Sequence, residues 1–165
     1  MTTVADGGYR DRILSYVGDK DPIASLEASC ERVRTLAAAL GSDGLGKPWA
    51  EGKWTGAQVL AHLADCEIAI GFRMRQIASE DNYQIQPFDE GKWAQRYADV
   101  DAQTALQSFV ASRRWNLEWM RRLSAADRAR EAFHPERGPE KLETVIRLLA
   151  GHDLNHLQQL EKLKA

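Results

Sequence analysis

The sequence predicts an all-α protein that folds as a four-helix bundle. Four segments, each of about 20 residues, carry apolar residues at spacings of three and four, which is the period of a helix with one buried face. Polar stretches that contain Gly or Pro separate these segments, and no segment shows convincing strand alternation. Amphipathic helices of this length bury their apolar stripes against one another as a bundle.

The chain has 165 residues, a length that suits one domain. Residues 1–20 are polar and are expected to form an N-terminal extension with a short helix near residues 9–17. Ile13, Leu14 and Val17 would pack this helix against the body of the protein. Residues 21–165 then form the bundle domain.

The first long helix begins at Asp21 and Pro22, because Asp is a favourable N-cap and Pro suits the first helical position. Gly41 is a suitable residue to end this helix, so residues 41–54 are expected to form a loop. The apolar stripe of the helix is Ile23, Leu26, Cys30, Val33, Ala37 and Leu40.

The second helix begins at Thr55, which forms a capping-box pattern with Gln58, and ends near Ala78. Its expected inner side is Val59, Leu63, Cys66, Ile70 and Ile77, widened by Leu60, Ile68 and Phe72. Residues 79–101 form a connection longer than the roughly 2–8 residues that join antiparallel neighbours. We therefore expect a crossover along the bundle, with a short helix in residues 89–97.

The third helix spans about residues 102–123 and is capped by Asp101, and the fourth spans about residues 142–164. A polar connection, residues 124–141, joins them. The stripe of the third helix is Leu106, Phe109, Val110, Arg113, Leu117 and Met120. The stripe of the fourth helix is Val145, Leu149, His152, His156, Leu160 and Leu163.

Composition excludes several classes of protein. The 22 basic and 24 acidic residues give a net charge of −2, which argues against a nucleic-acid partner. Two cysteines cannot build a disulfide framework and favour a reducing compartment. The segment Met1–Asp6 lacks the pattern of a signal peptide, and no apolar stretch approaches the roughly 18 residues that span a bilayer. We therefore expect a cytoplasmic protein without a membrane partner.

The placement of three histidines predicts a metal site. His152 and His156 are four residues apart on the inward face of the last helix, a spacing that two ligands of one metal ion can use. His62 lies on the inward stripe of the second helix. Three histidines leave a fourth coordination position open, as in catalytic zinc sites, and imidazole ligands favour Zn²⁺ or Ni²⁺. Gln159 is expected to support His156 or a bound water.

Together these residues resemble a known family. The chain resembles the DinB/YfiT-like superfamily in three segments. The first lies at the second helix and contains Trp54-Thr55 and the run His62 to Glu67, and the last helix carries the run His152 to Leu157 with Gln159. The region between them carries Arg73 and Arg75, Phe88 to Glu90, and Trp93. The resemblance implies an up-down-down-up bundle, often dimeric, with a divalent metal held by three histidines. These map to His62, His152 and His156. The family includes thiol S-transferases that use bacillithiol, mycothiol or glutathione, and metal-dependent hydrolases.

Other polar residues on the inner stripes have two interpretations each. Cys66 is either a fourth ligand or thiol beside the metal, or a small core residue. Arg113 either holds a substrate anion beside the metal or forms a buried ion pair with Glu67 or Asp65. Arg113 and Glu67 are therefore the candidate catalytic residues. Asp153 lies about 100° round the helix from His152, and both it and Glu67 are expected to orient a neighbour or to pair with an arginine rather than to act as a general base.

Two further features complete the expectations. His134 precedes Pro135 in a polar connection, where it is expected to be exposed or to make a loop hydrogen bond. Trp115 and Trp119 lie four residues apart, off the main stripe of the third helix, which favours a homodimer contact.

The function expected is that of a divalent-metal enzyme. A metal-bound thiolate would attack an electrophilic small molecule in an S-transfer reaction, with a low-molecular-weight thiol as the second cofactor. One alternative is a metal-dependent hydrolase that uses a bound hydroxide. Another is a non-catalytic metal-binding or stress-response module.

Overall fold

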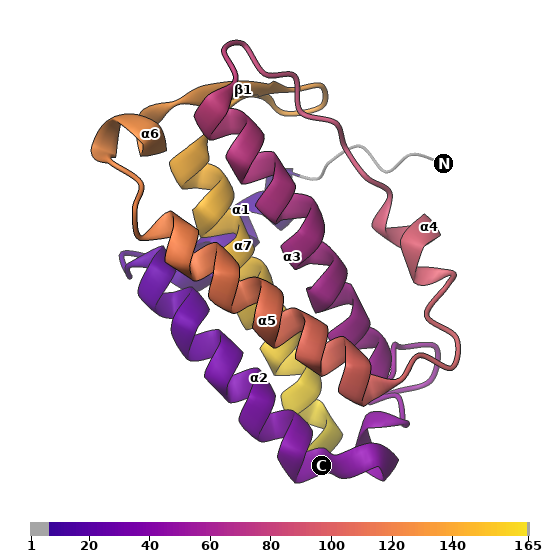
Figure 1. Cartoon of the computed structure of the whole chain (residues 1–165). Helices are drawn as coiled ribbons and strands as arrows, with labels where there is room; N and C mark the ends of the chain where they lie inside the picture. The colour runs from indigo at the N-terminus through magenta and orange to yellow at the C-terminus, as the bar shows by residue number, and fades with distance from the viewer. Residues whose placement is uncertain (1–6, 165) are drawn as a thin grey trace.

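Four long helices pack side by side in the computed structural model, which describes residues 7–164 (Figure 1). They are α2 (Pro22–Leu45), α3 (Gly56–Ser79), α5 (Ala102–Met120) and α7 (Leu142–Glu161), and a short 3-10 turn, η1 (Lys162–Lys164), follows α7. The expectation about a signal peptide concerns Met1–Asp6, which lie outside the described residues. No helix within residues 7–164 has the length and apolar character needed to cross a membrane.

The topology of the bundle is up-down-down-up, as expected. Figure 1 shows α2 and α7 running in one direction and α3 and α5 in the other. Residues 80–101 return the chain from the end of α3 to the start of α5 and include the short helix α4 (Glu90–Ala94). This long return makes α3 and α5 parallel neighbours, whereas a short loop would make them antiparallel.

The caps inferred from the sequence are present. Asp21 accepts hydrogen bonds from the backbone amides of the first turn of α2, and Asp101 accepts one from the backbone of Thr104. Thr55 and Gln58 form a reciprocal capping box at the start of α3. These bonds satisfy backbone amides that have no partner inside the helix, so they fix where each helix begins.

The N-terminal helix expected near residues 9–17 is α1 (Gly7–Val17), and it lies against α7. Ile13 and Val17 are buried in this contact. At Gly151 the backbone of α7 meets the backbone of α1, because a Cβ there would lie 2.0 Å from the carbonyl oxygen of Ile13. Only glycine allows so close an approach.

Two connections differ from expectation. Gly41 does interrupt the first helix, with φ 61° and ψ −175°, but helical structure resumes and α2 ends at Leu45. The polar connection before α7 was expected to lack strands, and this was wrong. It forms α6 (Ala125–Ala129) and an antiparallel hairpin, β1 (Glu131–His134) and β2 (Gly138–Lys141), in which Glu131 pairs with Lys141.

The hairpin depends on partners far away in the sequence. The backbone of Phe133 donates to Tyr83 and accepts from Ile85, so β1 also bonds to the crossover segment. Strands of four residues are too short for alternation to reveal them, and their stability comes from these long-range bonds.

The core consists of two apolar clusters separated by a polar layer. One cluster, toward the hairpin end, includes Met74, Met120 and Ile146, and the other includes Leu60, Phe109 and Leu157. Ile68 and Phe72 were expected to widen the buried face of α3, but each is 59% exposed. They lie on the outer edge of the apolar arc, beyond the part that the neighbouring helices cover.

Arg113 forms the centre of the polar layer and links all four long helices. Its guanidinium donates to both carboxylate oxygens of Asp153, at 2.6 and 3.0 Å, and to Glu67 at 2.6 Å. It also donates to Ser29 at 3.3 Å, and Ser29 in turn donates to Asp153. Burial alone would lower the pKa of Arg113, but the charges of Asp153 and Glu67 raise it instead.

Replacement of Arg113 should destabilise the fold strongly. Arg113→Met leaves the buried carboxylates of Glu67 and Asp153 without a counter-charge, and we expect a loss of about 3–5 kcal/mol in the free energy of unfolding. Urea unfolding followed by circular dichroism measures this loss. The matched control is Arg114→Met, an exposed neighbour on α5 whose change should stay within about 0.5 kcal/mol. Equal losses in the two variants would show that the network does not stabilise the bundle.

Candidate metal centre

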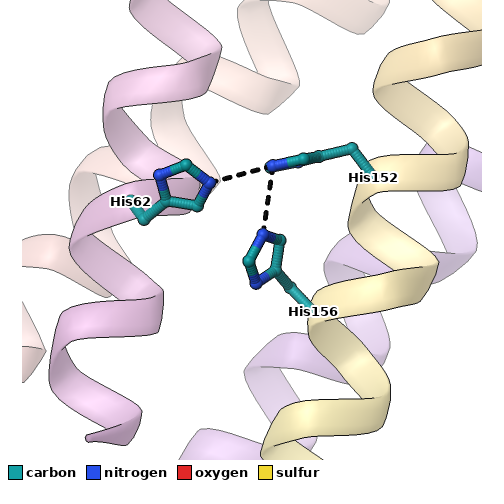
Figure 2. A group of neighbouring side chains, drawn as sticks. All are labelled: His62, His152 and His156. Carbon is teal, nitrogen blue, oxygen red and sulfur yellow. Dashed lines mark hydrogen bonds between the residues drawn. The ribbon is translucent and has the colours of Figure 1, made fainter. Parts of the chain in front are cut away.

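Three histidine side chains converge inside the bundle (Figure 2). His62 extends from α3, and His152 and His156 extend from successive turns of α7. The Nε2 atom of His152 lies 2.9 Å from that of His62 and 3.1 Å from that of His156. One nitrogen of each histidine lies within 4.8 Å of the other two. The structure therefore brings together the three residues that the sequence predicted as ligands.

The surroundings of these histidines keep them uncharged. Burial lowers the pKa of His62 to about 3, and a proton on the neighbouring His156 would lower it further. Burial is also the main reason that the pKa of His152 and that of His156 are lowered. Neutral imidazole is the form that binds metal ions, so the pocket selects the ligand form.

The hydrogen-bond geometry fits a cation between the three rings. His156 Nδ1 lies 3.0 Å from Gln159 Oε1 and donates to it, so its Nε2 presents a lone pair. His152 Nε2 has at most one proton and cannot donate well to both neighbours. Its Nδ1 is buried without a hydrogen-bond partner among residues 7–164. A cation would instead accept a lone pair from every ring.

The spacing of the donor atoms also suits a metal ion. Two nitrogens bound to a tetrahedral zinc ion at about 2.05 Å lie about 3.3 Å apart. The observed separations of 2.9 and 3.1 Å are close to that value. Gln159 holds His156 in the way that outer-shell groups commonly hold ligating histidines.

Two further side chains contact the histidines. Cys66 is buried, and its Sγ lies 3.6 Å from His62 Nε2 and 4.0 Å from His152 Nε2. Burial raises the pKa of its thiol well above the usual value, so Cys66 stays protonated in this structure. Glu90, from α4, places Oε2 3.9 Å from His62 Nε2, and its side chain is 52% exposed. The protein around the carboxyl group raises its pKa by partial desolvation, and the charge of Arg73 opposes this effect.

Glu90 is a site residue that the sequence analysis missed. The resemblance placed it in the crossover segment without a role at the histidines. Its position depends on how the crossover folds back over α3, and no local pattern reports that path. The only available signal was an acidic side chain in a connection too long to be a simple turn.

Aromatic rings enclose the other side of the histidines. Trp54 stacks on His156, with ring centroids 6.3 Å apart and an interplanar angle of 11°, and lies 5.0 Å from the His62 ring. Tyr97 packs against Trp54 and donates to Asp65 at 2.7 Å. This wall shields the nitrogen cluster from water on that side.

A cleft of about 730 Å³ reaches the site from the hairpin side. Its wall at the histidine end includes His152, Cys66 and Glu90, and Arg73 and Arg137 line it farther away. The volume is typical of a small-molecule site. Phe88 also forms part of this wall and packs on Trp93 with centroids 4.9 Å apart.

The two candidate catalytic residues lie elsewhere. Among the described residues that line the cleft, neither Arg113 nor Glu67 is present. Both belong to the buried network, so their arrangement matches the ion-pair interpretation, with Asp153 as the second partner in place of Asp65. A catalytic role for Arg113 or Glu67 stays a prediction.

Of the two alternatives expected for His134, the structure shows the loop hydrogen bond and not the exposed side chain. Only 2% of its surface is accessible, since the hairpin buries it at the far end of the cleft. Its Nδ1 does accept a hydrogen bond from the backbone of Glu136, as expected of a loop residue.

Comparison with known proteins identifies the family of this chain. Residues 25–160 match the family model described as the DinB superfamily. A candidate metal-dependent hydrolase of Oceanobacillus iheyensis is 32% identical over 126 residues, which cover 75% of this chain and 73% of the relative. Another from Geobacillus thermodenitrificans is 27% identical over 149 residues, covering 88% and 83% of the two chains.

A solved structure shares the fold. YfiT from Bacillus subtilis, described as a candidate metal-dependent hydrolase with an unusual four-helix-bundle topology, superposes with a TM-score of 0.79 at 21% identity. The match covers 99% of this chain and 90% of YfiT. The family model spans most of the bundle, and the Oceanobacillus relative is similar over nearly three quarters of both chains. This chain therefore belongs to the DinB superfamily.

Proposed function

We propose that this protein is a metal-dependent enzyme whose divalent ion is held by His62, His152 and His156. The observation that carries the proposal is the convergence of three Nε2 atoms inside the bundle, with one of the three histidines, His152, in the wall of a cleft. Zn²⁺ or Ni²⁺ suits a set of imidazole ligands. The names of the relatives as candidate metal-dependent hydrolases support metal dependence.

The reaction proposed is transfer of a thiol sulfur to an electrophilic small molecule. When bound, a divalent ion supplies a lowered pKa for a thiol or water at the position that the histidines leave open. The cleft admits a small molecule to that position past Cys66 and Glu90. The Glu90 carboxylate is placed to take the proton that a thiol or water releases, and Trp54 keeps water away from the opposite side.

Hydrolysis is the second candidate reaction, because the relatives are named for it. The same residues would serve, with water in place of the thiol. A metal-binding module without catalysis is the third, and the cleft argues against it because a purely structural ion needs no access route.

Metal content should depend on the three histidines. Protein purified without a histidine tag should contain close to one divalent ion per chain by elemental analysis. His152→Ala removes one ligand and should weaken zinc affinity by more than the roughly 10–100-fold expected of Gln159→Leu, which removes only the support of His156. His134→Ala is the control of matched residue type. Equal loss of metal in His134→Ala and His152→Ala would mean that the three ligands were wrongly chosen.

Thiol conjugation should require the metal, and removal of the metal should leave the fold unchanged. We expect the zinc-loaded protein to conjugate glutathione, bacillithiol or mycothiol to monobromobimane, and chelation with EDTA to abolish this activity while the circular dichroism spectrum is retained. Turnover of p-nitrophenyl esters without a thiol would favour hydrolysis instead. Unfolding on chelation would show that the ion is structural.

The same assay tests the proton acceptor. Glu90→Gln should slow conjugation by about 10²–10⁴-fold, the usual contribution of a positioned acid or base, with metal content unchanged. Asp89→Asn is the matched control, because Asp89 is exposed and Asn also caps a helix well. A rate loss in Asp89→Asn as large as in Glu90→Gln would assign the effect to the fold of α4.

The homodimer also remains a proposal, supported by an exposed apolar surface on α3 and α5. Trp115 is 60% exposed, and Ile68 and Phe72 are exposed on the adjacent helix. Trp115→Glu should weaken self-association by about 2 kcal/mol or more, as replacement of a central aromatic does. Sedimentation velocity measures this, with Phe133→Glu, an exposed apolar residue on the hairpin, as the control. A monomeric wild type would refute the dimer.

A further inference from the structure

Arg73 is a nearly buried arginine in the wall of the cleft. Only 8% of its surface is accessible, and that surface faces the cleft. Arg73 lies on α3 seven residues after Cys66, or two helical turns, which is about 10 Å along the helix axis. It therefore shares the cleft with the histidine site but lies at the other end.

The guanidinium of Arg73 lacks a carboxylate partner. Its one hydrogen bond to the protein is long, from Nη2 to the carbonyl oxygen of Gln86 at 3.4 Å, and its charge lies 5.8 Å from the centre of the Phe88 ring. No ion pair joins it to an acidic residue within the described chain. Arg113, in contrast, has two carboxylates. Buried charges without a partner are costly, so an unpaired one at a cleft indicates a missing anion.

Two other arginines, Arg137 and Arg10, line the cleft together with Arg73, and both approach the same carboxylate. Glu140 is the buried carboxylate there, and it is already bound by Arg137 through two hydrogen bonds of 3.1 and 2.9 Å. Arg10 approaches the same carboxylate at 4.0 Å. Burial lowers the pKa of Arg73 and the charge of Arg137 lowers it further, while the charge of Glu140 acts in the opposite direction.

Within residues 7–164 the other acidic residues of the lining form no ion pair with Arg73, although the charge of Arg73 acts on Glu90 and lowers the pKa of that carboxyl group. Asp89 caps α4 and lies 3.5 Å from Lys92, and Glu136 is exposed on the hairpin. Glu90 lies nearer the histidines, at 3.9 Å from His62. Three arginines therefore share one committed carboxylate at this end.

We propose that Arg73 anchors an anionic group of the substrate, a carboxylate or a phosphate, while the reacting part of the molecule lies at the histidine end of the cleft. A guanidinium presents a planar fork of donors that matches both anions. This proposal rests on the proposed function, because it assigns the histidine end to the reaction. It narrows the substrate class to small molecules that carry a negative charge about 10 Å from the reacting atom, which is the distance of two turns along α3.

The competing role for Arg73 is structural. Its contacts with Gln86 and Phe88 could simply hold the crossover against α3. That role predicts a loss of stability on substitution without any change in anion affinity, so the two roles differ in a measurable quantity.

The test is calorimetric titration with inorganic phosphate and, separately, with acetate at constant ionic strength. Each is added to the zinc-loaded protein and to protein treated with EDTA, because phosphate can also bind zinc. The variants are Arg73→Gln and Arg73→Lys, and the control is Arg114→Gln, which removes the same charge from an exposed position. Metal content is measured on every sample.

We expect Arg73→Gln to weaken binding of the preferred anion at least 10-fold in both forms of the protein, and Arg114→Gln to leave it unchanged. Arg73→Lys keeps the charge but not the fork and should be intermediate, which also preserves the test if Arg73→Gln fails to fold. The tighter of the two anions identifies the group as carboxylate or phosphate.

Two results would overturn the anion site. The first is that the wild-type protein binds neither phosphate nor acetate. The second is that the wild type and Arg73→Gln bind the preferred anion with equal affinity. Failure of the proposed function would give a different result. If the protein takes up no metal but binds an anion through Arg73, the proposed metal site is wrong and the anion site stands.

Discussion

The arrangement of the bundle depends on the buried ion network around Arg113. Its carboxylates belong to residues adjacent to the site, because Asp153 follows His152 on α7 and Glu67 follows Cys66 on α3. A shift of either helix by one turn would separate a carboxylate from the guanidinium and leave it buried and unpaired. The same shift would move His62 past His152 by about 5.4 Å. The network therefore also fixes the spacing of the three Nε2 atoms, although the hydrogen bonds of Arg113 within the described residues go to other partners.

The sequence predicts this fold and the histidine cluster well because both depend on local rules. Caps such as Asp21 and Thr55 act within a few residues, and the spacing of His152 and His156 determines their shared face. Features that depend on the path of distant segments were not predictable. The hairpin that buries His134 requires bonds to residues 83–85, and Glu90 reaches His62 only because the crossover folds back over α3.

The arginines also show that sequence patterns do not report partners from distant segments. An inward position on α5 correctly singled out Arg113 as buried and polar, but periodicity could not tell a paired arginine from an open one. Asp153 completes the pair from a different helix, whereas no carboxylate within residues 7–164 forms an ion pair with Arg73. The anion-holding role first considered for Arg113 is therefore better suited to Arg73, whose free donors face a cleft. Both the burial of an arginine and the presence of a carboxylate partner are needed to assign its role.

The choice of ligands determines how reactive such a site can be. Three neutral imidazoles leave the charge of a divalent ion uncompensated, whereas thiolate ligands would reduce it, and a higher remaining charge lowers the pKa of a bound thiol or water further. In the proposed metal site two features would maintain this state. Burial raises the pKa of the Cys66 thiol beside His62, which disfavours a thiolate ligand there, and the Glu90 carboxylate lies 3.9 Å from His62 Nε2. At the other end of the cleft lies Arg73, the proposed anion anchor, so in metal-loaded protein both ends would attract anionic groups and would together orient a substrate.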